Sequence, residues 1–256
     1  MKYLGIDIGG SGVKGAVVDT RKGLFVTDRL RIATPQPATP DAVTDVVSQI
    51  VKHFDWDGAV GCTFPGVVTH GTIHTAANLD KSWVGVDAGK HFTKAVGSHV
   101  TVMNDADAAG VAEQAFGAAR KEAGVVLMVT LGTGIGSALI HRGELVPNTE
   151  LGHLELHGDD AERYASDAAR ERLALSWADW AGRLSEYFAL LENLTWPDLF
   201  VVGGGVSKEP DLFLPLIECR TKIVPARLRN KAGIIGAALY AERRHADEKG
   251  KRPRRL

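Results

Sequence analysis

The start of the chain has the pattern of hydrophobic and polar positions that is typical of a β-hairpin. Apolar residues alternate with small or acidic ones from Leu4 to Ile8, the glycine-rich stretch Gly9 to Gly12 follows, and an apolar run resumes at Ala16. Two strands joined by a turn are therefore predicted, with Asp7 just before the turn. Glycines let backbone N–H groups approach an anion, and Lys14 adds a cation, so the turn is a candidate phosphate cradle. An ordinary glycine hairpin is the alternative.

A second stretch repeats this pattern in the other half of the chain. The apolar run Val125 to Leu131 leads into Gly132-Thr133-Gly134, and a further apolar run, Ile135 to Ile140, follows. Two similar hairpins indicate a duplicated fold. We expect their glycine turns to face each other across a cleft.

Elsewhere the periodicity predicts alternating strands and helices. Apolar residues at helical spacing predict a helix, whereas short apolar runs bounded by turn residues predict buried strands. We expect a strand from Gly23 to Arg31, a helix from Ala42 to Phe54, a strand from Ala59 to Phe64, a helical region from Ala161 to Leu194 with a break near Ser176, a strand from Asp198 to Gly203 and a last helix from Ala232. This order predicts an α/β protein with a mixed sheet.

A strand that runs directly into an alanine-rich helix supplies the candidate catalytic residues. The segment His99 to Gly110 places Asn104 and Asp105 at the carboxyl end of a strand, where α/β sheets bind their ligands. Asp105 is suited to accept a proton from an attacking hydroxyl group, with Asn104 holding that hydroxyl. One of Asp105 and Asp107 is expected to serve only as the helix cap, or as an acid in the first turn that the helix dipole favours.

The irregular stretch from His70 to Gly89 has two interpretations. It is long for a loop in a compact domain, and such loops are often functional. Asn78 then offers an amide to a hydroxylated ligand, and Trp83 forms a wall of the site. The alternative is a packed loop with a buried tryptophan.

Composition narrows the classes of function. The chain has 256 residues, 45% of them hydrophobic, and a net charge of -1, so it can bury a sizeable core and has no global field that attracts nucleic acid or a membrane. Cys62 and Cys219 form no metal-ligand spacing, which favours a reducing compartment. Since no run reaches about 18 apolar residues and no signal peptide is evident, we expect a cytoplasmic protein.

The motifs in this order resemble the ROK family of repressors, open reading frames and sugar kinases. The resemblance covers nearly the whole chain and is carried by Asp7-Ile8-Gly9-Gly10, Asn104-Asp105, Leu131-Gly132-Thr133-Gly134-Ile135-Gly136 and Glu150-Leu151-Gly152-His153. Within that family, Thr63 to Val68, Ala77 to Trp83 and Pro225 to Gly233 are similar to actinobacterial polyphosphate glucokinases and polyphosphate/ATP glucomannokinases. The resemblance implies a duplicated actin/hexokinase-like (ribonuclease H-like) fold of two domains with a substrate cleft between them.

The resemblance also implies roles for individual residues. Asp105 matches the catalytic base that takes the proton from the 6-hydroxyl of the sugar, and Asp7 matches the acid that holds Mg²⁺ through water. The sugar-binding residues implied are Gly66, Asn78, Asn104, Asp105, Glu150, His153 and Glu162. The phosphate and donor residues implied are Asp7, Gly9, Gly10, Ser11, Gly12, Lys14, Thr130, Gly132, Thr133, Gly134, Gly203, Gly204, Gly205 and Lys231.

One departure from the family concerns zinc. Many ROK kinases have a cysteine-rich zinc site after the histidine of the sugar-binding motif, yet this chain has no cysteine from His153 to Ser166. His153 alone cannot supply a tetrahedral site, so no zinc is expected. The nearby His157, Asp159 and Asp160 are interpreted as a solvated loop.

We therefore predict a kinase that transfers a phosphoryl group from polyphosphate, and also ATP, to glucose. The first domain is expected to comprise residues 1–108 plus about 233–256, and the larger second domain residues 109–232. A homodimer is expected, with no nucleic-acid or membrane partner. Cations along one groove would bind polyphosphate, the best candidates being Lys14, Lys81, Arg227, Arg229 and Lys231. The alternatives are an ATP-dependent ROK hexokinase acting on glucose or mannose, a sugar-sensing regulator and an actin-like ATPase. A regulator is expected to have a DNA-binding module before the first hairpin, and the strand starting at Tyr3 leaves no room for one.

Overall fold

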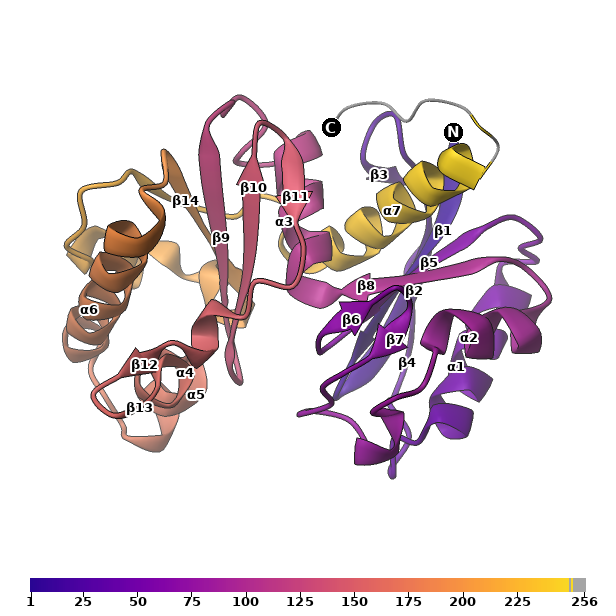
Figure 1. Cartoon of the computed structure of the whole chain (residues 1–256), viewed down its shortest axis with the longest axis horizontal. Helices are drawn as coiled ribbons and strands as arrows, with labels where there is room; N and C mark the ends of the chain where they lie inside the picture. Colours follow the sequence, from indigo (N-terminus) through magenta and orange to yellow (C-terminus); the bar gives the residue numbers. More distant parts are fainter. Residues whose placement is uncertain (249, 251–256) are drawn as a thin grey trace. The chain divides into compact units, whose positions relative to one another are not determined.

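The computed structural model describes residues 1–248 and 250, and it contains two compact units, each with its own sheet (Figure 1). The first unit comprises Met1–Ala112 and the segment that begins at Asn230, and the second comprises Glu113–Arg229. Lys249 and residues 251–256, which we assigned to the first domain, lie outside the described residues.

The sheet of the first unit is mixed, as predicted from the order of elements. Its strands follow the order β3-β2-β1-β5-β8, with β4 also paired to β2. The first hairpin is confirmed, because β1 pairs antiparallel with β2, and β1, β5 and β8 are parallel. The strands are β1 (Lys2–Gly9), β2 (Gly12–Asp19), β3 (Leu24–Phe25), β4 (Leu30–Ile32), β5 (Val60–Phe64) and β8 (Val100–Asn104).

The single strand that we predicted from Gly23 to Arg31 is wrong: this stretch forms the two short strands β3 and β4. Between them, the hydroxyl oxygen of Thr27 accepts a hydrogen bond from the backbone N–H of Val17 at 3.1 Å. A side chain thereby takes the place of a backbone carbonyl in the ladder along β2, and the pairing breaks into two parts.

The first unit contains helices α1 (Pro40–His53), α2 (Ala88–Val96) and α7 (Ala232–Glu248), and also the start of α3 (Asp105–Phe116), whose last residues belong to the second unit. Helix α1 begins where Thr39 accepts a hydrogen bond from the N–H of Ala42 and Pro40 occupies the first turn. Its apolar face, which includes Val47 and Ile50, packs into the core of the unit.

In the stretch from His70 to Gly89, Trp83 agrees with the second interpretation, a buried tryptophan in a packed loop, whereas Asn78 is exposed. Trp83 is fully buried, and its indole N–H donates to the carbonyl oxygen of Ala38 at 2.9 Å. Its ring contacts Phe64 and Phe92 in the core. Trp83 therefore does not form an exposed wall of a site. Around it lie β6 (Val68–Thr69), β7 (Thr72–Ile73) and the 3₁₀ turn η1 (Lys81–Trp83).

Helix α7, yellow in Figure 1, lies very close to the sheet of the first unit. A Cβ atom added to Gly5 would lie 2.0 Å from the carbonyl oxygen of Ile234, and one added to Gly61 would lie 1.8 Å from that of Ala237. A real Cβ atom does not tolerate such distances, so glycine is required at both positions. The missing side chains bring the helix backbone against the strands.

The sheet of the second unit has the order β11-β10-β9-β14-β15. The second predicted hairpin is confirmed, because β9 and β10 pair antiparallel, whereas β9 and β14 are parallel. The strands are β9 (Val125–Leu131), β10 (Ile135–His141), β11 (Glu144–Val146), β14 (Leu199–Gly204) and β15 (Ile223–Pro225). A small separate hairpin consists of β12 (Glu155–Leu156) and β13 (Asp159–Asp160).

The predicted helical region of the second unit is divided into α4 (Ala161–Ala165), α5 (Asp167–Arg172) and α6 (Trp177–Thr195). Ser166 and Ser176 cap the second and third of these helices through their hydroxyl oxygens, so the break near Ser176 is confirmed and a second one occurs at Ser166. Trp180 and Phe188 of α6 pack in the core of this unit. No helix in the described part of the chain has the length and apolar character needed to cross a membrane.

Candidate active site

Asp7 is held rigidly at the end of the first strand. Its Oδ1 atom accepts a hydrogen bond from the hydroxyl of Thr63 at 2.9 Å, and that hydroxyl oxygen in turn accepts from the N–H of Ile8 at 3.1 Å. Its Oδ2 atom lies 3.4 Å from Nζ of Lys14, the residue directly opposite on β2. The carboxylate therefore has a fixed orientation and retains lone pairs, which suits a metal-bound water.

The glycines of the first turn lie close to neighbouring groups. The left-handed glycines found in the described residues do not include Gly9, Gly10 or Gly12. A Cβ atom on Gly10 would lie 3.2 Å from the backbone oxygen of Asn78, and one on Gly12 would lie 2.8 Å from Nε of Arg31. The turn thus brings the predicted sugar residue Asn78 beside the predicted phosphate loop.

Asn104, rather than either aspartate, caps helix α3. Its Oδ1 atom accepts from the N–H of Asp107 at 3.0 Å, and its amide nitrogen donates to the carbonyl oxygen of Gly66 at 3.1 Å. Neither aspartate is the cap, but both lie in the first turn of the helix, which is the other role that we expected for one of them. Asp107 is buried, whereas Asp105 is exposed at the first residue of the helix. Asp105 is therefore the carboxylate that a substrate can reach.

The start of α7 adds a cation to this unit. Lys231, in the 3₁₀ turn η6 (Arg229–Lys231), places its ammonium nitrogen 5.7 Å from the centre of the Phe25 ring. Two residues later, a Cβ atom on Gly233 would lie 2.8 Å from Oδ1 of Asp7. The first turn of a long helix, whose dipole favours anions, thus lies beside the Asp7 carboxylate.

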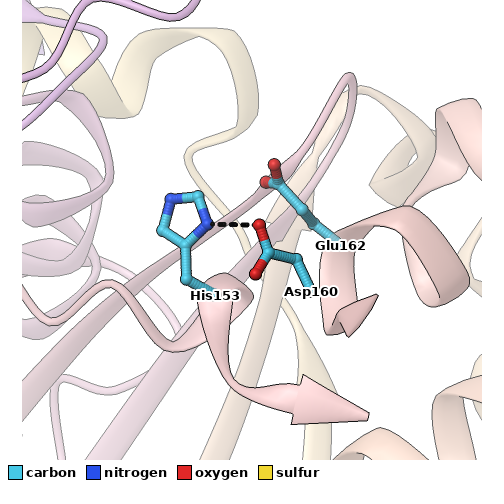
Figure 2. Close-up of side chains that lie close together, drawn as sticks. All are labelled: His153, Asp160 and Glu162. Atoms are coloured by element: carbon cyan, nitrogen blue, oxygen red, sulfur yellow. Dashed lines mark hydrogen bonds and ion pairs between the residues drawn. The ribbon is translucent and has the colours of Figure 1, made fainter. Parts of the chain in front are cut away.

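The second unit brings together two of the predicted sugar-binding residues and one residue that we misjudged. Figure 2 shows His153, Asp160 and Glu162 side by side. His153 follows Glu150 in the 3₁₀ turn η2 (Leu151–His153), and its Nδ1 atom lies 3.2 Å from Oδ2 of Asp160. Asp160 is therefore a partner of His153 and not part of a merely solvated loop. No sequence pattern indicates this contact, because it depends on the short hairpin of β12 and β13.

These three side chains form the kind of cluster that can hold a metal ion. One ligand atom from each lies within 4.8 Å of the others. A structural zinc site usually has four protein ligands and is rich in cysteine, whereas this set offers one nitrogen and two carboxylates, partly exposed. The set does not fit a structural zinc site, and the absence of zinc stays a prediction.

The electrostatics of this cluster act on Glu150. Burial raises the pKa of its carboxyl group, the charge of His153 lowers it, and the negative charge of Glu162 raises it. The two glutamates therefore influence each other electrostatically. A ligand that donates hydrogen bonds to both carboxylates would relieve that repulsion.

The second glycine turn is built around Glu162. The N–H of Gly132 donates to the carbonyl oxygen of Gly134 at 3.1 Å, which closes the turn. Oε2 of Glu162 accepts from the N–H of Ile135 at 3.2 Å and lies 2.4 Å from the position of a Cβ atom on Gly134. The predicted phosphate loop and the predicted sugar-binding glutamate are therefore in contact.

The triple glycine at the end of β14, Gly203 to Gly205, has structural reasons of its own. Gly204 has a φ of 89°, and a Cβ atom there would lie 2.0 Å from the carbonyl oxygen of Leu131. A Cβ atom on Gly203 would lie 2.7 Å from the end of Met128. At Gly205 no described atom lies within 4 Å of that position. Only Gly205 is thus left open to approach by a ligand.

The predicted site residues form two groups, one in each unit. The first unit contains Asp7, Gly9, Gly10, Ser11, Gly12, Lys14, Gly66, Asn78, Asn104, Asp105 and Lys231. The second contains Thr130, Gly132, Thr133, Gly134, Glu150, His153, Glu162, Gly203, Gly204 and Gly205. The contacts described above lie within each group.

The sequence of the chain is similar to a known protein family and to characterised kinases. A family model described as the ROK family matches residues 3–169. The chain is 50% identical over 236 residues to the polyphosphate glucokinase of Mycobacterium tuberculosis (strain CDC 1551 / Oshkosh), covering 92% of this chain and 89% of that protein.

Solved structures match over nearly the whole chain. The inorganic polyphosphate/ATP-glucomannokinase of Arthrobacter sp. strain KM has a TM-score of 0.91 and 50% identity, covering 95% of this chain and 99% of that one. A ROK family glucokinase from Streptomyces griseus, solved with glucose and AMPPNP, has a TM-score of 0.81 and 27% identity, covering 94% and 99%. The predicted α/β fold, with its two similar halves, is thereby confirmed.

Proposed function

The chain belongs to the ROK family, and from that membership we propose that it is a glucokinase that uses inorganic polyphosphate as phosphoryl donor. The observation that carries the proposal is 50% identity over 92% of the chain to a protein named polyphosphate glucokinase. The exposed Asp105, directly after β8, supports it because it supplies a base. His153 and Glu162, together with Glu150, whose carboxyl group they influence, supply several hydroxyl-binding groups.

We assign the general base to Asp105. It is exposed at the start of α3, and its Oδ1 atom accepts a hydrogen bond from the N–H of Ala106 at 2.9 Å, which orients the carboxylate. As O6 of glucose attacks the terminal phosphorus, Asp105 takes the hydroxyl proton. The bond from that phosphorus to the bridging oxygen breaks, so glucose 6-phosphate forms and the polyphosphate is shortened by one unit.

The remaining hydroxyl groups of the sugar are assigned to two sets of residues. Asn104 and Asn78 supply amides, and the carbonyl oxygen of Gly66 accepts a hydrogen bond from the amide of Asn104. Glu150, His153 and Glu162 supply two carboxylates and an imidazole. Because hydrogen bonds to charged groups are stronger than neutral ones, the second set should dominate sugar affinity.

We assign the donor to the two glycine turns, with Asp7 as the acid of the metal site. When bound, Mg²⁺ would neutralise charge on the transferred phosphoryl group. Mg²⁺ usually keeps several waters and uses one or two carboxylates, which agrees with the single, rigidly held Asp7 carboxylate beside Thr63 and Lys14. Ser11 and Thr133 add hydroxyl groups at the tips of the two turns, and Thr130 and Lys231 are further candidates for donor contacts.

A second donor and a second sugar are also proposed. The similar Arthrobacter enzyme is named a polyphosphate/ATP-glucomannokinase, and the similar Streptomyces glucokinase was solved with AMPPNP. We therefore expect ATP to be used as well, with Gly205 beside the nucleoside, and mannose to be an acceptor. We also propose that the protein acts as a cytoplasmic homodimer.

The decisive experiment measures glucose 6-phosphate with purified protein, magnesium and either polyphosphate or ATP. We expect product from both donors with glucose, and none without a sugar acceptor. Activity with ATP but not polyphosphate would identify an ATP-dependent hexokinase instead. Activity with neither donor would refute the kinase assignment.

A further inference from the structure

A row of charged side chains crosses the sheet of the first unit beside the first glycine turn. Asp7 on β1 is directly opposite Lys14 on β2, and Lys14 is directly opposite Arg31 on β4. Residues directly opposite each other in a ladder project on the same face of the sheet. The face therefore has an acid, a cation and a second cation on three neighbouring strands, which lie about 4.8 Å apart.

The outer cation of this row is not neutralised. Lys14 has Asp7 at 3.4 Å, and both side chains are about three-quarters buried. Arg31 is exposed, and no carboxylate in the described part of the chain lies within ion-pair distance of it. Like charges placed directly opposite each other destabilise a sheet, so a bound anion would offset a cost that the free protein bears.

The turn is shaped to receive the Arg31 side chain. One guanidinium nitrogen donates to the backbone oxygen of Ser11 at 2.9 Å. A Cβ atom on Gly12 would lie 2.8 Å from Nε and 2.9 Å from Nη2 of Arg31, so only glycine leaves room for the guanidinium there. Arg31 thus sits against the predicted phosphate loop, although the sequence motifs of that loop do not include it.

The guanidinium retains donors for a ligand. It has five N–H groups in a planar fork that matches phosphate oxygens, and the bond to Ser11 uses one nitrogen. Because the hydrogen bond to Ser11 holds the guanidinium in place, its remaining N–H groups can bind two oxygens of one phosphate group. The neighbouring Lys14 offers only a point charge.

We propose that Arg31 binds the part of a polyphosphate chain that follows the transferred phosphoryl group. This inference rests on the proposed function, in which the terminal phosphate lies near Asp7. The chain then passes Lys14 on β2 and reaches Arg31 on β4. ATP has three phosphates and then a nucleoside, so it gains less than a long polyanion from a cation placed further out.

The test compares Arg31→Gln with Arg31→Lys and with Arg21→Gln. Arg21 is an exposed arginine in the turn after the opposite end of β2, so Arg21→Gln removes the same charge away from the loop. The Michaelis constants for polyphosphate, ATP and glucose are measured over a series of potassium chloride concentrations. Thermal melts show whether each variant folds.

For Arg31→Gln we expect the KM for polyphosphate to rise about tenfold, the size of one charged hydrogen bond. The slope of log KM against log salt should fall by about 0.7, as for the loss of one phosphate contact on a single-stranded polyanion. The KM for ATP should change less than threefold and the KM for glucose should not change. Arg31→Lys should keep the wild-type salt slope for polyphosphate. Arg21→Gln should behave as wild type.

An Arg31→Gln variant that loses both donors equally and keeps the wild-type salt slope would overturn the inference, since Arg31 would then only brace Ser11. Binding of fluorescently labelled polyphosphate, followed by anisotropy without glucose, separates this inference from the proposed function. If the wild type binds polyphosphate but does not transfer from it, weaker binding by Arg31→Gln still supports the inference. Equal binding by both proteins overturns it, as does no binding by the wild type.

Discussion

Substituting Gly134 by alanine should damage sugar binding through Glu162 without damaging the fold. The Cβ atom of the alanine would lie 2.4 Å from Oε2 of Glu162, and only 3.2 Å from its carboxyl carbon. The backbone at Gly134 is not left-handed, so alanine is tolerated there. The clash falls on the far end of a flexible side chain, and the carboxylate therefore moves instead of the loop.

The size of the effect follows from the distance. To reach ordinary van der Waals separation at 3.4 Å, the carboxylate oxygen must withdraw by about 1 Å. A misplacement of about 1 Å at a site can cost about 100-fold in rate. We expect kcat/KM for glucose to fall 10- to 100-fold. The melting temperature should not fall, because replacing glycine by alanine reduces the entropy of the unfolded chain.

The assay is steady-state kinetics with glucose as the varied substrate, and Gly132→Ala is the matched comparison. At Gly132 no described atom lies within 4 Å of the added Cβ, so its KM for glucose should equal the wild-type value whatever happens to the donor. On a Glu162→Gln background, Gly134→Ala should cause little further loss, since the two changes act on one group. A wild-type KM for glucose in Gly134→Ala, or full additivity in the double variant, would refute the reasoning.

Three further predictions test other parts of the structure. Asp105→Asn should lower turnover at least ~100-fold with little change in glucose affinity, measured by single-turnover kinetics and calorimetry, whereas near-normal turnover would exclude Asp105 as the base. Glu192 is buried, which raises its pKa, but hydrogen bonds from Thr221 and Arg220 outweigh burial and lower it below the usual 4.5. The stabilisation from Glu192 is therefore present above about pH 4.5 and is lost as the pH falls through the lower pKa of the folded state. In urea titrations, Glu192→Gln should lower the free energy of unfolding by about 1–3 kcal/mol at pH 7 and by less near pH 4. Metal analysis should find no stoichiometric zinc, and one tightly held zinc per chain would instead assign it to the cluster of His153, Asp160 and Glu162.

The periodic parts of the fold could be predicted from the sequence. The hairpin from Leu4 to Val18 and the strand that ends at Asn104 have long apolar runs with clear boundaries, and the structure has both. The prediction of one strand from Gly23 to Arg31 was wrong because the side chain of Thr27 replaces a backbone acceptor. A pattern of hydrophobic residues does not show such a replacement.

The candidate residues could be predicted, but not their partners. Asp105 was identified from its place at the end of a strand, whereas the capping role of Asn104 depends on a bond from the N–H of Asp107. The contact of Asp160 with His153 depends on a hairpin whose strands have two residues each, too short for any periodic signal. Arg31 lies 20 residues from the oxygen of Ser11 that it binds.

The glycine motifs locate the two candidate turns correctly, but they do not tell why glycine occupies these positions. Glycine-rich turns suggest left-handed backbone, yet Gly12 leaves room for the guanidinium of Arg31 and Gly134 leaves room for the carboxylate of Glu162. In each turn, the absent side chain is replaced by a charged group from a distant part of the sequence, a cation beside the first turn and an anion beside the second. The two turns are alike in sequence but opposite in local charge. The donor is assigned to both turns, but the two added Cβ atoms meet different groups, Arg31 at Gly12 and Glu162 at Gly134. We therefore expect Gly12→Ala to raise mainly the KM for polyphosphate, and Gly134→Ala to raise mainly the KM for glucose.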